Sequence, residues 1–196
     1  DELGPVITSG DDKTGSNSIR ACDLSRFDTI IIDSRALAAH PRLASASQCL
    51  TGYSGRGGNL VILAQDAPAW NSLAVSRQLS PHAIKLSPER LGPEPGAFKI
   101  IEPEHALLLQ PNKITEKDFE NWTGVRATAM PGEWAAEYHA LLEWTGADGK
   151  AEKGALLVAQ SGEGSVIYTS LDLKAQVLAL NPAAFRIFSN IVGYRK

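Results

Sequence analysis

Hydrophobic residues along the chain fall into short runs separated by polar turns, a pattern that favours alternating strands and helices. Residues 27–33 and 59–64 are continuous apolar runs rich in β-branched side chains, which is typical of strands buried on both faces. Between them, apolar residues at helical spacing predict a helix over residues 41–53, which ends at the glycine-rich stretch 55–58. Strand, helix and strand in this order predict a right-handed unit with two parallel strands.

Shorter apolar runs predict further strands in the second half of the chain. They cover residues 82–86, 97–101, 140–144, 155–159 and 165–169. The last two are joined by Gln160–Gly164, whose glycines can adopt a positive φ, so this pair predicts a hairpin. At the other end, residues 5–8 predict a short strand, and the Gly-, Asp- and Ser-rich residues that follow lead us to expect a poorly ordered segment over residues 1–22.

Two further helices are indicated by capping residues. Thr115, with Asp118 three residues later, predicts the start of a short helix that ends near Trp122. Asn181 followed by Pro182 predicts the start of a C-terminal helix. Its apolar stripe is predicted to consist of Phe185, Phe188, Ile191 and Val192, which would pack on the sheet. With no internal repeat and no long linker, residues 1–196 are expected to form one α/β domain.

Composition and charge narrow the functional classes. The 19 basic and 22 acidic residues give a net charge of −3 without a dense Lys/Arg cluster, so a nucleic-acid partner is not expected. No apolar run approaches the roughly 20 residues of a membrane span, and the first residues lack the pattern of a signal peptide. Because the chain begins with Asp1, we expect a piece of a longer protein. Cys22 and Cys49 are interpreted as separate thiols, since two cysteines make no disulfide framework.

Motifs for nucleophilic, metal or phosphate chemistry are incomplete. The segment Gly52–Arg56 approaches a nucleophile elbow but lacks its final glycine and follows a helix, so Ser54 is interpreted as an ordinary serine and Cys49 as a core residue. The four histidines lie 42, 23 and 34 residues apart, which is not the spacing of a zinc site. The glycines at 55–58 precede a strand, whereas those of a phosphate loop precede a helix.

A binding crevice is expected at the carboxyl ends of the parallel strands. Asp33, Ser34, Arg35, Gln65 and Asp66 should lie there. Arg35 could bind a carboxylate or paired hydroxyls, and a salt bridge to a nearby aspartate is an equally open alternative.

Aromatic residues in loop-like segments were the other candidates for this crevice. Trp70 with Asn71, and Glu133 with Trp134, would edge it, where an aromatic ring could stack on a sugar. Packing in the core is the favoured alternative for both tryptophans.

An ordered series of segments resembles a known family. Asp23–Ile30, Arg35–Ala36 and Gly58–Ile62 resemble the first half of a glutamine-amidotransferase-like domain found at the C-terminal side of bacterial deacetylases of the PIG-L/LmbE type. The more specific part is His105–Leu108 followed by Pro111–Trp122. The likeness continues in order through Glu133–Trp134, Lys153–Ala159, Gly162–Gly164, Tyr168–Thr169 and Ala184–Asn190.

This resemblance implies a fold, a role and a partner. The fold would be a flavodoxin-like three-layer sandwich with a mostly parallel central sheet and antiparallel additions over residues 140–170. The role would be that of a non-catalytic accessory domain of a zinc-dependent carbohydrate deacetylase, docking on the catalytic domain of the same polypeptide or assisting glycan binding. Ala39–Leu43 lacks the paired aspartates of that family's zinc signature, so no cofactor is expected in this chain and zinc is expected in the parent's catalytic domain. Such parents are often exported.

A free-standing hydrolase or amidotransferase is the alternative. A carboxylate can orient and charge an imidazole, so Glu133 or Glu137 with His139 would be its first candidate pair.

Overall fold

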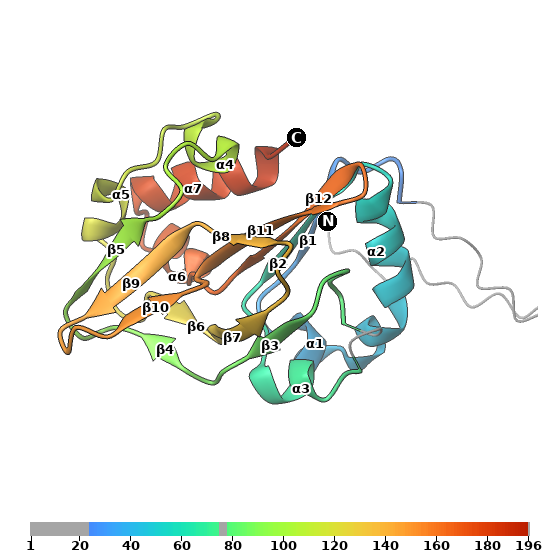
Figure 1. Cartoon of the computed structure of the whole chain (residues 1–196), viewed down its shortest axis with the longest axis horizontal. Coiled ribbons are helices and arrows are strands. Elements are labelled where there is room, and N and C mark those ends of the chain that lie inside the picture. Colours follow the sequence, from blue (N-terminus) through green and yellow to red (C-terminus); the bar gives the residue numbers. More distant parts are fainter. Residues whose placement is uncertain (1–23, 75–77, 196) are drawn as a thin grey trace, which may run out of the picture.

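The computed structural model describes residues 24–74 and 78–195, and the predicted strand at 5–8 and the expected disorder of 1–22 lie outside these ranges. A five-stranded sheet forms the centre of the molecule (Figure 1). Its strands, in spatial order, are β1 (Thr29–Ile32), β2 (Asn59–Leu63), β12 (Gly164–Thr169), β11 (Leu156–Ser161) and β8 (Tyr138–Ala140). β1 pairs with β2 and β2 with β12 in parallel, whereas β12–β11 and β11–β8 are antiparallel. The sheet is therefore mixed rather than mostly parallel.

The two strands predicted from the first half of the chain pair as expected. Ile30 lies opposite Leu60 in a parallel register, which confirms the strand–helix–strand unit. The predicted hairpin is also confirmed, with Ser161 opposite Gly164. Gly162 has φ 56°, and a Cβ atom there would lie 2.4 Å from the carbonyl oxygen of Gly55, so the turn needs glycine at this position.

Antiparallel additions flank the main sheet. β9 (Leu142–Gly146) pairs with β10 (Ala151–Lys153) and β5 (Gly96–Ile100), β3 (Ile84–Leu86) pairs with β7 (Pro131–Trp134), and β4 (Arg90–Leu91) pairs with β6 (Ala127–Thr128). The strand predicted over 140–144 is thus divided between two sheets. Leu141 is the joint: its N–H donates to Leu156 of the main sheet, and its carbonyl oxygen accepts from Ile101, which follows β5.

Each face of the main sheet carries its own core. Along β2, Leu60 and Ile62 pack on one side, while Val61 and Leu63 pack on the other. The first side is covered by α1 (Ala36–Ala39), the 3₁₀ helix Pro41–Ala46, α2 (Ser47–Gly55) and α3 (Ala67–Asn71). The second is covered by α4 (Ala106–Leu109), α5 (Lys117–Glu120), α6 (Leu173–Leu178) and α7 (Pro182–Gly193). Because apolar residues fill both faces of the strand, continuous apolar runs predicted it correctly.

Helix starts were predicted more accurately than helix faces. Asn181 caps α7, since its side-chain oxygen accepts from the N–H of Ala183 at 3.0 Å. The predicted apolar stripe is wrong at Phe185, which is 46% exposed. The buried face of α7 instead consists of Ala184, Ile187, Asn190 and Ile191.

Two other local predictions need correction. The predicted helix over 41–53 begins as a 3₁₀ helix, and only Ser47–Gly55 is α-helical. Cys49 is disulfide-bonded, so its interpretation as a separate thiol is wrong; Cys22 lies outside the described residues. Of the helices in the described ranges, none is long and apolar enough to cross a membrane.

Candidate functional site

The carboxyl ends of β1, β2 and β12 lie side by side, as three adjacent parallel strands require. β2 leads into α3 on one face of the sheet and β12 leads into α6 on the other, so the connections diverge between these two strands. Such a divergence is where ligands bind in many open α/β sheets. Asp33 follows β1, and its carboxylate lies 3.6 Å from the Lys174 ammonium of α6.

A buried amide fixes the turn that presents Arg35 here. The Gln65 side chain donates to the carbonyl oxygens of Asp33 and Leu63 and accepts from the N–H of Leu37. Arg35 is held with φ 58°, a left-handed conformation that non-glycine residues seldom adopt, and its N–H donates to Ala64. Its side chain is exposed, and none of the ion pairs among the described residues involves it. The alternative of a salt bridge to an aspartate is not found within that part of the chain.

Three side chains near this position bond the backbone: Asp66, Trp70 and Asn71. The Asp66 carboxylate caps α3 by accepting from the N–H of Ala69. Trp70 is fully buried and donates from Nε1 to Ile84, so it offers no surface for stacking on a sugar. Asn71 both donates to and accepts from the backbone of Leu86. The segment was interpreted as a loop, but Asp66 as N-cap with Pro68 in the first turn is a helix-start signal that the sequence contains.

Glu133 and Trp134 lie on β7, which pairs with β3. The Glu133 carboxylate forms an exposed ion pair with Lys85 at 2.9 Å. Trp134 is partly exposed and lines a small pocket beside β10. No hydrogen bond or ion pair among the described residues joins either residue to Arg35 or Asp66, whereas Trp134 lies opposite Ile84, whose carbonyl oxygen accepts from Trp70.

The histidine proposed for an alternative enzyme has a different carboxylate partner. Glu102, and neither Glu133 nor Glu137, lies beside His139, with its oxygens 3.1 and 3.2 Å from Nδ1. Glu137 instead lies 4.0 Å from His82. The sequence could not show the Glu102 pair, because 37 residues separate its members.

His105 lies beside this pair and stacks on Tyr194. The ring centroids of His105 and His139 are 6.1 Å apart, and that of Tyr194 is 5.7 Å from His105. Burial lowers the pKa of His105, the nearby Glu102 carboxylate raises it in part, and the neighbouring His139 imidazole lowers it. Within the described ranges, no group of three or more His, Cys, Asp or Glu residues is arranged to hold a metal ion.

The segments that carry the family resemblance meet in the structure. The Asn190 side chain is fully buried, accepts from the backbone and side-chain N–H groups of Asn112, and donates to the carbonyl oxygens of Leu107 and Asn112. Arg186 donates to the buried carboxylate of Asp118 and to the carbonyl oxygen of Lys113. These residues therefore hold the 105–122 segment against α7. A structural role in this packing explains why they occur in the sequence.

Asp118 also orders the start of α5. Its carboxylate accepts from the N–H of Thr115 at 2.8 Å, as a capping box requires. The Thr115 hydroxyl donates to the same carboxylate, however, and Glu116 occupies the cap position. Half of the predicted capping box is therefore present.

A groove of about 640 Å³ lies beside this junction, between α5 and the α6–α7 connection. Its lining includes Lys117, Asn121, Gln176, Leu180, Asn181 and Arg186. Among the described residues, three large apolar side chains are exposed: Leu180 (76%), which lines the groove, and Leu178 (75%) and Phe185 (46%), which are sequence neighbours of lining residues. The sequence analysis did not predict this surface. A signal was present, because the apolar run Val177–Leu180 extends past Gln176, the last buried residue of α6.

Comparisons with known proteins identify structures of similar fold and nothing more specific. No known family and no curated protein matches the chain. A cytoplasmic protein of Salmonella typhimurium, STM3548, matches with a TM-score of 0.56 at 15% identity over 88% of this chain and 74% of its own. Another, STM1381 from strain LT2, matches with a TM-score of 0.50 at 16% identity, covering 90% and 74%.

Larger enzymes give weaker matches. An exo-β-1,4-mannosidase from an Opitutaceae bacterium, Op5Man5, has a TM-score of 0.44 at 17% identity over 88% of this chain, which spans 26% of that enzyme. At 15% and 16% identity, the likeness to the two Salmonella proteins concerns the fold alone.

Proposed function

We propose that this chain is a non-catalytic accessory domain of a PIG-L/LmbE-type zinc-dependent deacetylase, which docks on the catalytic domain of the same polypeptide. The groove between α5 and the α6–α7 connection is the proposed docking face. The observation that carries this proposal is the exposure of Leu180, which lines that groove, together with Leu178 and Phe185, which are adjacent in sequence to the lining residues Ala179 and Arg186; these three are the exposed large hydrophobic residues of the described chain. Clustered apolar exposure is typical of an interaction surface.

The rigidity of the surroundings also supports a docking role. Asn190, Arg186 and Asp118 lock the segment before α5 to α7, so both walls of the groove are held in place without a partner. A preformed surface loses little conformational entropy on binding, which favours association. The resemblance supplies the identity of the partner, since residues from its more specific segment 111–122 and from its later segment 184–190 line this groove.

The same proposal includes the finer fold assignment. A flavodoxin-like three-layer arrangement is supported by separate cores on the two faces of the sheet and by the parallel β1–β2–β12 strands. Under this proposal the zinc ion and the hydrolytic chemistry belong to the parent's catalytic domain, and the parent is exported.

The test is the affinity of this chain for the catalytic domain encoded in the same reading frame. Leu178→Asp and Phe185→Asp should each weaken binding measured by calorimetry at least tenfold, because each places a charge in an apolar contact. Ala38→Asp is the matched control, since Ala38 is exposed on α1 on the opposite side of the sheet. A reading frame without a zinc deacetylase domain, or equal binding by all variants, would refute the proposal.

The second candidate function is the free-standing hydrolase or amidotransferase, which the Glu102–His139 pair favours. A carboxylate that accepts from Nδ1 leaves Nε2 of His139 to act as a base. This alternative predicts turnover of glutamine or an acetylated amino sugar by the purified chain, and loss of that turnover in His139→Ala. Lack of turnover by the wild-type chain on both substrates would remove it.

A further inference from the structure

The disulfide at Cys49 is a feature that the proposed function does not use. Cys49 lies in the first turn of α2, is half-buried and is disulfide-bonded. The 196-residue chain contains two cysteines, Cys22 and Cys49. A bond from Cys49 within one chain therefore has a single candidate partner, although Cys22 lies outside the described residues.

The chain shortly after Cys22 is held against the same helix. The Tyr53 hydroxyl of α2 donates to the carbonyl oxygen of Phe27 at 3.0 Å, and the N–H of Phe27 donates to the carbonyl oxygen of Leu24. Leu24 and Phe27 pack against the core to which Leu50 and Tyr53 of α2 belong. Leu24 follows Cys22 by two residues, which span at most about 7 Å, so a bond from Cys22 to α2 extends an existing contact.

We propose that Cys22 and Cys49 form one redox-sensitive disulfide, which cross-links the chain before β1 to α2, and that the domain matures where thiols are oxidised. Disulfides form and persist in oxidising compartments, and they are rare where glutathione and thioredoxin keep thiols reduced. The proposal thus assigns the domain to an oxidising environment on chemical grounds, independently of the family resemblance.

The bond forms by two successive exchanges with an oxidant that is itself a disulfide, such as oxidised glutathione. The thiolate of one cysteine attacks a sulfur of the oxidant, which breaks the S–S bond of the oxidant and releases one glutathione. The thiolate of the other cysteine then attacks the protein sulfur of this mixed disulfide and releases the second glutathione. The two cysteines lose two electrons and two protons, and the oxidant gains them as two glutathione thiols.

The cross-link stabilises the fold by restricting the unfolded chain. Its two cysteines are 27 positions apart, and the loop between them contains β1, α1 and the 3₁₀ helix. Closing a loop of this length typically raises the folding equilibrium constant by roughly 10²- to 10³-fold. Within the described ranges β1 is an edge strand that pairs with β2 alone, so the cross-link restrains a strand with few partners.

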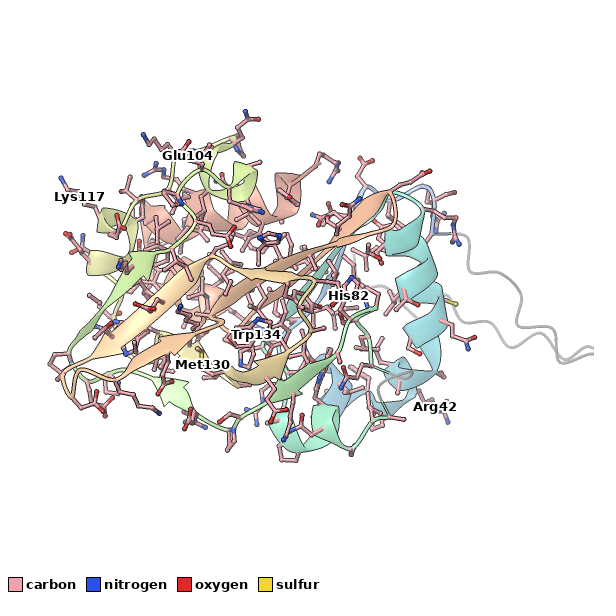
Figure 2. All side chains as sticks on the ribbon, in the orientation of Figure 1. Arg42, His82, Glu104, Lys117, Met130 and Trp134 are labelled. Atoms are coloured by element: carbon pink, nitrogen blue, oxygen red, sulfur yellow. The ribbon has the colours of Figure 1, made fainter. Side chains whose placement is uncertain are left out.

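The cross-link lies far from the docking face. α2 covers one side of the main sheet, whereas α5, α6 and α7, which form the groove, cover the other. Figure 2 shows Arg42, on the 3₁₀ helix that precedes α2, and Lys117, which lines the groove, at opposite ends of the molecule. Failure of the disulfide proposal therefore leaves the docking proposal standing, and the reverse also holds.

The first experiment identifies the bonded partner. The full chain is refolded in a mixture of reduced and oxidised glutathione, digested with trypsin without reduction, and mapped by mass spectrometry. Because trypsin cleaves after arginine, we expect one linked pair of peptides, residues 21–26 and 43–56, from monomeric protein. Free thiols at both positions, or Cys49 linked to Cys49 of a second copy, would overturn the proposal.

The second experiment measures what the bond contributes. Addition of dithiothreitol should lower the midpoint of thermal unfolding of the oxidised chain by about 5–15 °C. The double variant Cys22→Ser with Cys49→Ser is the matched control: it should unfold at the temperature of the reduced wild type and should not respond to dithiothreitol. Equal midpoints for the oxidised and reduced wild-type chain, or an equal response of the double variant, would contradict the proposal.

Discussion

Three non-glycine residues adopt a left-handed backbone conformation that is energetically unfavourable for them. Arg35, Ala129 and Leu180 adopt positive φ values of 58°, 54° and 56°, a conformation that costs a non-glycine residue roughly 1–2 kcal/mol. Surrounding bonds hold Arg35 in place, and Leu180 donates its N–H to Val177 at the end of α6. Both side chains are exposed, so their identities are not explained by the core.

Leu180→Asn should stabilise the isolated chain. Asparagine tolerates the left-handed conformation better than leucine, so we expect the free energy of unfolding to rise by about 0.5–1 kcal/mol in denaturant titrations. The same substitution should weaken docking, because Leu180 is an exposed apolar residue of the proposed face.

Leu178→Asn is the matched control. Leu178 is equally exposed but helical, and asparagine lowers helix propensity, so its stability should fall slightly. The two variants are expected to change stability in opposite directions, so a loss of stability in Leu180→Asn would contradict the account.

Two buried tryptophans differ in the hydrogen bonding of their indole N–H groups. Trp70 donates to Ile84, whereas Nε1 of Trp122 has no hydrogen-bond partner among the described residues. Both substitutions to phenylalanine remove similar volume, but only Trp70→Phe removes a hydrogen bond. We expect Trp70→Phe to be more destabilising than Trp122→Phe by about 1 kcal/mol in chemical denaturation. The reverse order would show that the Trp122 N–H is satisfied in solution.

At the scale of elements, the clamp between the 105–122 segment and α7 should carry much of the local stability. Asn190→Leu preserves size but leaves the carbonyl oxygens of Leu107 and Asn112 without their donor. Each unsatisfied buried group costs about 1–3 kcal/mol, so we expect a loss of about 3 kcal/mol or more in thermal or chemical unfolding. Ser189→Ala, at an exposed neighbour on the same helix, should change stability little.

The start of α4 should respond to pH through His105. Its Nδ1 accepts from the N–H of Leu107, which requires the unprotonated form at that atom. Burial lowers the pKa of His105 in the folded state below its usual 6.5, so the unfolded chain binds more protons as pH falls. The stability contributed by this group is complete above pH 6.5 and is lost as pH falls through the folded-state pKa.

His105→Asn tests this assignment. Asparagine can cap the helix without titrating, so the variant should lose less stability than wild type between pH 7.5 and pH 5. Parallel pH dependences in the two proteins would show that other groups are responsible.

Helices, strands and turns could be predicted from short stretches of sequence. Which distant segments they contact could not. The Asn181–Pro182 start of α7 and the Gly162 turn depend on a few adjacent residues, and both were predicted correctly. Phe185 was assigned to the wrong face because the helix buries polar Asn190 in place of an apolar stripe. The Glu102–His139 pair and the division of residues 140–144 depend on contacts with distant segments, which no local pattern contains.

At the scale of the whole molecule, the candidate site was predicted in part. Arg35 and Asp66 lie at the strand ends, as the parallel sheet required, because strand direction alone determines that position. Trp70 and Asn71 were candidates for the crevice because their segment was interpreted as a loop. Their side chains bond the backbone of β3, and the favoured alternative of core packing is confirmed for Trp70. The groove is formed by residues of α5, α6, α7 and their connections, so its shape could not be predicted from the sequence.

The most direct measurement of the docking proposal is amide hydrogen exchange of this chain alone and within its full polypeptide. The account predicts slower exchange over residues 176–188 in the full polypeptide, because a partner would cover Leu178, Leu180 and Phe185, while residues 36–55 on the opposite face should exchange equally in both. Identical exchange over residues 176–188 in the two forms would contradict it.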